Sequence, residues 1–142
     1  ISYNDADRAS VFYLVQKLKQ YDLSVWMDVE KLVAGDLISD KIDIGLKSAS
    51  SIIICISKSG ISNWQNTEIG AALENHNTSK SGFKIIPVLM PSGDDRLIPD
   101  SIRQFVYIDF RSSFEDIIQW DRLLSALKGE EIASNIVNNS TF

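Results

Sequence analysis

The stretch SIIICIS, residues 51–57, decides the fold class of this sequence. Five consecutive apolar residues stand between serines, and such a run is typical of a central parallel strand that is covered on both faces. Strand and helix patterns alternate on either side of it. Further strands are expected at 1–3, 23–27, 84–90 and 105–108, and helices at 5–20, after Gly35, after Ser62 and after Ser113.

This alternation predicts an α/β, flavodoxin-like fold with three layers: a five-stranded parallel sheet with helices on both faces. The expected strand order is 2-1-3-4-5, in which ligands bind beyond the carboxyl ends of the first and third strands. The residues expected there are Tyr3, Asn4 and Asp5, and the chain from Ser57 onward. Pro87 is expected to mark a strand end or a bulge, because proline has no N–H to donate.

Local patterns predict how the helices begin and which faces they bury. Ser62 and Gln65 have the spacing of a capping box. Gly35 is expected to adopt a positive φ in a turn, and Cys55 to be an inert part of the core. The residues expected to face inward are Val11, Leu14, Val15 and Leu18 in the first helix, and Phe114, Ile117, Leu124 and Leu127 in the last.

Composition excludes several classes of function. The 142 residues are 44% hydrophobic and 23% charged, which is typical of a globular domain. A net charge of −5 with no Lys/Arg cluster argues against a nucleic-acid partner. One histidine and one cysteine do not suffice for a zinc site or a Cys–His catalytic pair, so no metal and no cofactor are expected. No apolar run is long enough to span a membrane, and the single cysteine favours a reducing, cytoplasmic compartment.

The ends of the sequence indicate the domain limits. Ile1 lies inside an expected strand, so residues 1–128 are expected to form one domain with a truncated first strand. Residues 129–142 are polar and read as a C-terminal tail or linker. Two common classes of protein with such folds do not fit this sequence. A dinucleotide-binding domain needs glycines in the turn after the first strand, which this turn lacks, and a phospho-receiver domain has an aspartate where Ser57 stands.

Four segments resemble, in order, a Toll/interleukin-1 receptor (TIR) domain. They are ISYNDAD at 1–7, SVWMDVEKLVAGD at 24–36, SIIICIS followed by NWQNTEIGAAL at 63–73, and IIPVL followed by YIDF at 107–110. Together they cover about 110 residues, the size of one typical domain.

Within that family the sequence is more similar to the NAD-cleaving branch than to the adaptors. The loop at 28–35 is similar to that of the animal TIR protein that destroys NAD in injured axons. The W-x-x-x-E pattern and the LLSAL ending are similar to bacterial TIR effectors of antiphage defence. The resemblance implies that Glu68 is catalytic, and it implies two further sets of residues. NAD as substrate would contact Tyr3, Asn4, Asp28, Leu37 and Trp64, and other TIR domains would contact Asp28, Glu30, Lys31, Gly35 and Asp36 in self-assembly.

The chemistry of NAD cleavage agrees with this implication. Trp64 and Glu68 are four positions apart on an expected helix, so they share one face. Nicotinamide leaves a cationic pyridinium as a neutral base, so no general acid is needed and one carboxylate can suffice where ordinary glycosidases use two. Glu68 would bind the ribose hydroxyls and stabilise the developing oxocarbenium charge, with Trp64 as an apolar wall.

Alternatives remain open for the residues and for the function. Without the motif, Glu68 reads more readily as a solvated helix glutamate, and Trp64 reads equally well as a core anchor. One candidate function is an NAD(+) nucleohydrolase that makes ADP-ribose or a cyclic product, activated by self-assembly, in bacterial antiphage or cell-death signalling. The other is a non-catalytic TIR adaptor that acts by homotypic interaction. The W-x-x-x-E pattern favours the enzyme, because an adaptor does not need that glutamate.

Overall fold

The structure is a computed structural model, and it describes residues 1–25, 34–37, 45–78 and 82–128. Its longer helices are α1 (Arg8–Lys19), α3 (Asn63–Thr78) and α4 (Ile117–Lys128). Its strands are β1 (Ser51–Ile56), β2 (Lys84–Leu89) and β3 (Ile108–Asp109). Single turns of 3-10 helix stand at η1 (Asp5–Asp7), η3 (Asp95–Leu97) and η4 (Asp100–Ile102).

The strands form a parallel sheet in the order β1-β2-β3. β1 and β2 pair along their whole length, whereas β3 pairs only with the last two residues of β2. On the other edge of β1, Ser2 forms an isolated parallel bridge with Ile54. The Ser2 N–H donates to the Ile53 carbonyl, and the Ser2 carbonyl accepts from the Cys55 N–H, each at 2.8 Å. The first, third, fourth and fifth expected segments therefore lie side by side in the predicted order.

The prediction of five strands is wrong for the described residues, which hold a three-stranded sheet. The first expected strand is reduced to the bridge at Ser2. Residues 23–25 do not form a strand, and the rest of the second expected strand lies outside the described residues. The fifth begins only at Ile108. Before it, the Phe105 N–H donates to the Ile102 carbonyl in a turn, and the Phe105 ring packs toward α3, so this part of the chain does not pair with β2.

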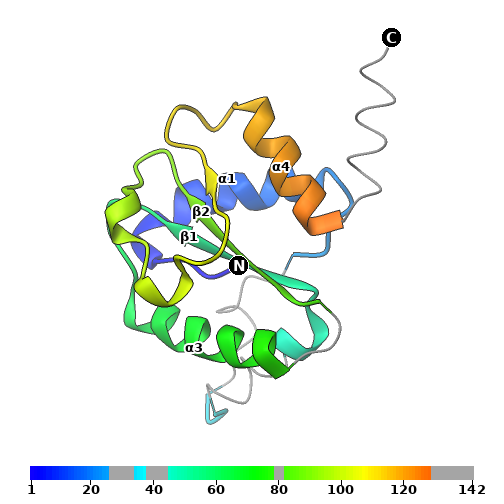
Figure 1. Ribbon diagram of the computed structural model, residues 1–142, viewed down its shortest axis with the longest axis vertical. Coiled ribbons are helices and arrows are strands. Elements are labelled where there is room, and N and C mark those ends of the chain that lie inside the picture. The colour runs from blue at the N-terminus through cyan, green and yellow to red at the C-terminus, as the bar shows by residue number, and fades with distance from the viewer. Residues whose placement is uncertain (26–33, 38–44, 79–81, 129–142) are drawn as a thin grey trace.

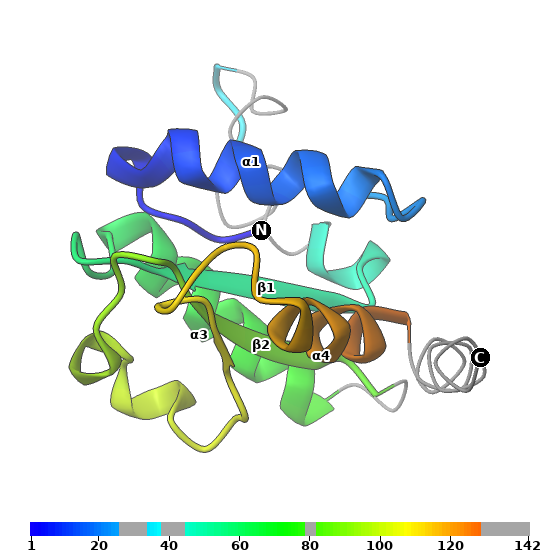
Figure 2. The same cartoon turned by 90° about the horizontal axis from the view of Figure 1, so that it is seen from above.

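Helices cover both faces of the sheet, as the three-layer prediction requires. Figure 1 shows α1 and α4 on one face and α3 on the other. In Figure 2, seen from above, α4 lies in front of β2 and α3 lies behind the strands. The side chains of β1 alternate between the two layers. Ile53 and Cys55 belong to the cluster under α1 and α4, whereas Ile52, Ile54 and Ile56 belong to the cluster under α3.

The buried helix faces are confirmed for α1 and corrected for α4. All the inward positions predicted in the first helix are buried. Among the residues predicted to face inward near the last helix, Leu124 is buried, and Phe114 and Leu127 are partly buried against the same core. Ile117 is 73% exposed, so its predicted position is wrong. The predicted face was counted from a helix that begins at Ser113. Ser113 instead starts a turn, and the Asp116 side chain caps α4 by accepting from the Gln119 N–H, so Trp120 takes the inward position.

Pro87 lies inside β2 without ending or bending it, contrary to the prediction. It pairs with Ile54 in an unbroken register. The N–H groups of Lys84 and Met90 donate toward β1, so the alternate positions of β2, which include Pro87, face the side of β3. Pairing with β3 begins only at Val88. The missing N–H of Pro87 therefore costs the sheet no ladder hydrogen bond.

Candidate functional site

The end of the first segment is fastened to the loop that follows β1. The Asn4 side chain accepts a hydrogen bond from the Ala6 N–H at 3.1 Å and so caps η1. Its Nδ2 group donates to the carbonyls of Ser59 and Gly60, each at 3.4 Å. The carboxyl ends of these two segments, where the fold predicts a ligand, therefore lie together.

Asp7 and Ser57 form a second link at this edge of the sheet. The Ser57 hydroxyl donates to the Asp7 carboxylate at 2.5 Å, and the Ser59 hydroxyl donates to it at 3.4 Å. The Ser59 N–H in turn donates to the Ser57 hydroxyl at 3.0 Å. The sequence analysis did not single out Asp7. The signal that could have identified it is a short polar residue soon after the end of an expected strand.

The first turn of α3 carries the predicted capping box and an additional anchor. The Ser62 hydroxyl accepts from the Gln65 N–H, and the Gln65 side-chain oxygen accepts from the Ser62 N–H, each at 3.1 Å. The side-chain amide of Gln65 also donates to the Cys55 carbonyl at 2.9 Å. Gln65 is fully buried. The capping prediction is confirmed, and the link from Gln65 to β1 is a feature that the sequence did not reveal.

Trp64 and Glu68 lie one turn apart on α3, as their spacing predicts. Glu68 is only 3% exposed, so the alternative of a solvated helix glutamate is wrong. Trp64 is half-buried and packs against the cluster under α3, in agreement with the core-anchor alternative. A contact of Trp64 with a substrate stays a prediction.

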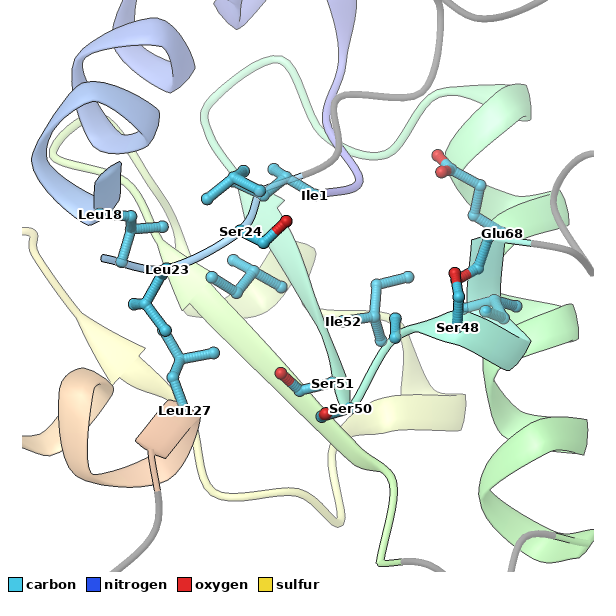
Figure 3. A pocket seen from close by; sticks show the side chains of 15 residues that line it. Ile1, Leu18, Leu23, Ser24, Ser48, Ser50, Ser51, Ile52, Glu68 and Leu127 are labelled. Carbon is cyan, nitrogen blue, oxygen red and sulfur yellow. The ribbon is translucent and has the colours of Figure 1, made fainter. Parts of the chain in front are cut away.

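Glu68 lines a pocket of about 350 Å³ that runs beside the first half of β1. Figure 3 shows Glu68 and Ser48 on one side of this pocket, with Leu18, Leu23 and Leu127 on the opposite side. Apolar side chains and serines make up the remaining described lining. Among the described residues that line the pocket, Glu68 alone has an ionisable side chain.

The other predicted substrate residues are not gathered around this pocket in the described structure. Tyr3 is buried in the cluster under α1 and α4, on the sheet face opposite to α3. Asn4 and Trp64 are not among the described lining residues, and Leu37 is 66% exposed. Asp28 lies outside the described residues.

The predicted assembly loop is described only at its end. Gly35 has a φ of +96°, so the prediction of a turn that needs a positive φ is confirmed. Asp36 is exposed. Glu30 and Lys31, like Asp28, lie outside the described residues, so their part in assembly stays a prediction.

A second cavity, of about 700 Å³, lies at the opposite edge of the sheet. Its lining is predominantly apolar and comes from β2, the chain around Phe105 and α4. The predicted substrate and assembly residues that the structure describes do not line it. The candidate site is therefore the smaller pocket that contains Glu68.

The described residues offer few other reactive groups. Burial raises the pKa of the Cys55 thiol to about 12, so this sulfur is a poor nucleophile at neutral pH. Among the described residues, no three His, Cys, Asp or Glu side chains are grouped so that they could hold a metal ion. None of the described helices is long and apolar enough to cross a membrane.

Comparison with known families agrees with the four segments and the fold. The profile of the TIR domain matches residues 1–124, which is nearly the whole described chain. No curated protein sequence gives a match. TIR domains are signalling modules that associate with one another. The α/β layers, the parallel sheet and this match lead to one assignment: the chain belongs to the TIR domain family.

Proposed function

We propose that this TIR domain is an NAD(+) nucleohydrolase, which cleaves the bond between nicotinamide and ribose. One observation carries the proposal: Glu68 is buried, and its carboxyl group is the single ionisable side chain among the described lining residues of a pocket. A charged group is costly to bury, so a glutamate kept in such surroundings is a candidate for function. Its position four residues after Trp64 is that of the catalytic glutamate in the NAD-cleaving TIR domains that the sequence resembles.

In this reaction the bond from C1′ of the ribose to the pyridinium nitrogen breaks, and its electron pair neutralises the ring. The ribose becomes oxocarbenium-like in the transition state, and the Glu68 carboxylate stabilises that positive charge. Burial of Glu68 keeps bulk water away from its carboxylate, which lowers the local dielectric and strengthens this attraction. Water then adds at C1′ and releases one proton to the solvent to give ADP-ribose, or a ring nitrogen of the adenine forms the bond to C1′ to give a cyclic product.

The size of the pocket indicates which part of NAD enters it. About 350 Å³ is near the lower end of the range for small-molecule pockets. We infer that the nicotinamide and its ribose occupy the pocket, and that the remainder of the dinucleotide extends beyond it.

We further propose that self-association switches the enzyme on, and that it acts in the cytoplasm in antiphage or cell-death signalling. The loop at 28–36, rich in charge, is the proposed contact with a neighbouring TIR domain. Tethering several copies raises their effective concentration to the millimolar range, which compensates for a weak contact.

The test is nicotinamide release from NAD by the purified chain at high concentration, with a matched pair of variants. Glu68→Gln keeps the size of the side chain and removes its charge, and it should lower the rate at least about 100-fold. Glu74→Gln changes an exposed glutamate on the same helix and should leave the rate unchanged. If the wild-type chain is shown to be assembled and releases no nicotinamide, the enzyme proposal is wrong and the adaptor alternative is favoured.

A further inference from the structure

Gln65 joins the first turn of α3 to the end of β1 through a buried amide. We propose that Gln65 is the positioning residue for Glu68: its amide sets where the turn that carries the carboxylate lies relative to the sheet. The catalytic consequence rests on the function proposed above, whereas the positioning itself does not.

Both ends of the Gln65 amide are occupied. The oxygen accepts from the Ser62 N–H at 3.1 Å, and the nitrogen donates to the Cys55 carbonyl at 2.9 Å. A glutamine side chain has one acceptor and one donor group, and each is used here in a fully buried place. Removing either partner of a buried hydrogen bond leaves a polar group without compensation, so this geometry is held strongly.

The Cys55 carbonyl stands where the backbone ladder beside β1 stops. Ser2 exchanges two backbone hydrogen bonds with this edge of β1, through the Ile53 carbonyl and the Cys55 N–H. In a continuing parallel ladder, the next acceptor on that edge is the Cys55 carbonyl. The Gln65 amide donates to it, so the first turn of α3 is linked to the point at which the first segment leaves the sheet.

This anchor lies next to Glu68 on the helix. Residues three and four positions apart share a helix face, so Glu68 follows Gln65 on the side that faces the sheet. Ile69, the next residue, is buried with Ile54 and Ile56 in the cluster under α3. The apolar contact fixes the height of the helix over the sheet, and the Gln65 amide fixes its position along β1.

The experiment compares Gln65→Met and Gln65→Glu with Ser62→Ala in the same chain. Methionine keeps the length of the side chain without hydrogen bonds, and an ionised glutamate keeps the acceptor but loses the donor. Ser62→Ala removes the capping hydroxyl at the same helix end but leaves the bond from Gln65 to Cys55. The rates are divided by the fraction of folded protein, which is measured by circular dichroism at the assay temperature.

Both Gln65 variants should lower kcat about 10-fold to 100-fold with little change in KM, because a misplacement of about 1 Å costs that much in rate. Ser62→Ala should stay within about threefold of the wild type, because it leaves the link to Cys55 intact. Hydrogen exchange gives a readout without activity: the amides of residues 66–69 should exchange faster in both Gln65 variants than in Ser62→Ala.

Two outcomes would overturn the inference. One is wild-type kcat in folded Gln65→Met, and the other is exchange at residues 66–69 no faster than in Ser62→Ala. An assembled wild-type chain without NAD cleavage would remove the proposed function and any catalytic role for Gln65. The exchange comparison would then still decide whether the Gln65 amide positions the turn that carries Glu68.

Discussion

The Ser57 hydroxyl donates a 2.5 Å hydrogen bond to the Asp7 carboxylate, across 50 positions of the chain. Asp7 is the residue before α1, and in the described part of the chain its side chain does not cap that helix. Its carboxylate serves instead to hold the start of α1 against Ser57, the residue that follows β1. The pair therefore joins the start of α1 to the carboxyl end of β1, the edge of the sheet at which folds of this kind bind ligands.

Ser57→Ala should destabilise the protein, because it removes a charge-assisted hydrogen bond from a nearly fully buried hydroxyl. We expect the free energy of unfolding to fall by about 1–3 kcal/mol in urea denaturation. Ser59→Ala removes a longer contact, at 3.4 Å and exposed, and should change it by less than about 0.5 kcal/mol. An equal decrease in the free energy of unfolding in the two variants would show that the Ser57–Asp7 hydrogen bond stabilises the protein no more than the Ser59–Asp7 contact does.

The Cys55 thiol should not react with a thiol reagent in the native protein at pH 8, because it is buried and its pKa is about 12. In denaturant it should react at once. The pKa of this thiol is higher in the folded than in the unfolded state, so the unfolded chain loses its proton first as the pH rises. Stability should therefore fall between about pH 9 and 12 and be unaffected by this group below that window. Fast labelling under native conditions would contradict the burial.

Gly35→Ala and Gly70→Ala should have opposite effects on stability. Gly35 has a φ of +96°, which an alanine adopts only with strain of about 1–2 kcal/mol. Gly70 lies inside α3 with nothing within 4 Å of an added Cβ, so alanine should stabilise the helix by about 1 kcal/mol. Thermal unfolding of both variants tests this difference in sign.

Gly35→Pro should lower nicotinamide release strongly in a folded protein, because proline fixes φ near −65°. Circular dichroism would establish that the sheet and helices remain. Full activity in that folded variant would mean that the loop does not need its native shape.

Specific activity should rise with protein concentration, because we propose that the working form is an assembly. The measurement is the initial rate of nicotinamide release over about two decades of enzyme concentration, enough to cross a weak association constant. Charge reversal at Glu30 or Lys31 should reduce the rise while leaving Glu68 in place. A strictly linear plot from a confirmed monomer would show that one chain carries the whole site.

The sequence predicted features that depend on neighbouring residues. The run at 52–56 became β1, the capping box formed at Ser62 and Gln65, and the apolar face of α1 is buried as expected. Each of these depends on contacts within a few positions or on a period that one element imposes. The alternation of strand and helix patterns predicted the order of the strands, which the sheet confirms where it is described.

Features that depend on distant contacts were not predictable in the same way. The burial of Glu68 depends on how α3 lies over the sheet, and the link from Asp7 to Ser57 joins separate elements. The late start of β3 follows from the packing of Phe105 toward α3, which overrides its strand preference. Ile117 was wrongly placed on the inward face because Asp116, and not Ser113, caps α4.

The orientation of Pro87 has a consequence for the behaviour of the concentrated protein. The short β3 leaves the first half of β2 without a neighbouring strand on that side in the described structure. Such an edge is a template for edge-to-edge aggregation, because its free N–H and carbonyl groups can pair with another chain. Pro87 has no N–H to donate on that side, so a second strand cannot form a continuous row of backbone hydrogen bonds along this edge of β2. A residue that looks unfavourable in a central strand therefore protects the protein against uncontrolled sheet growth.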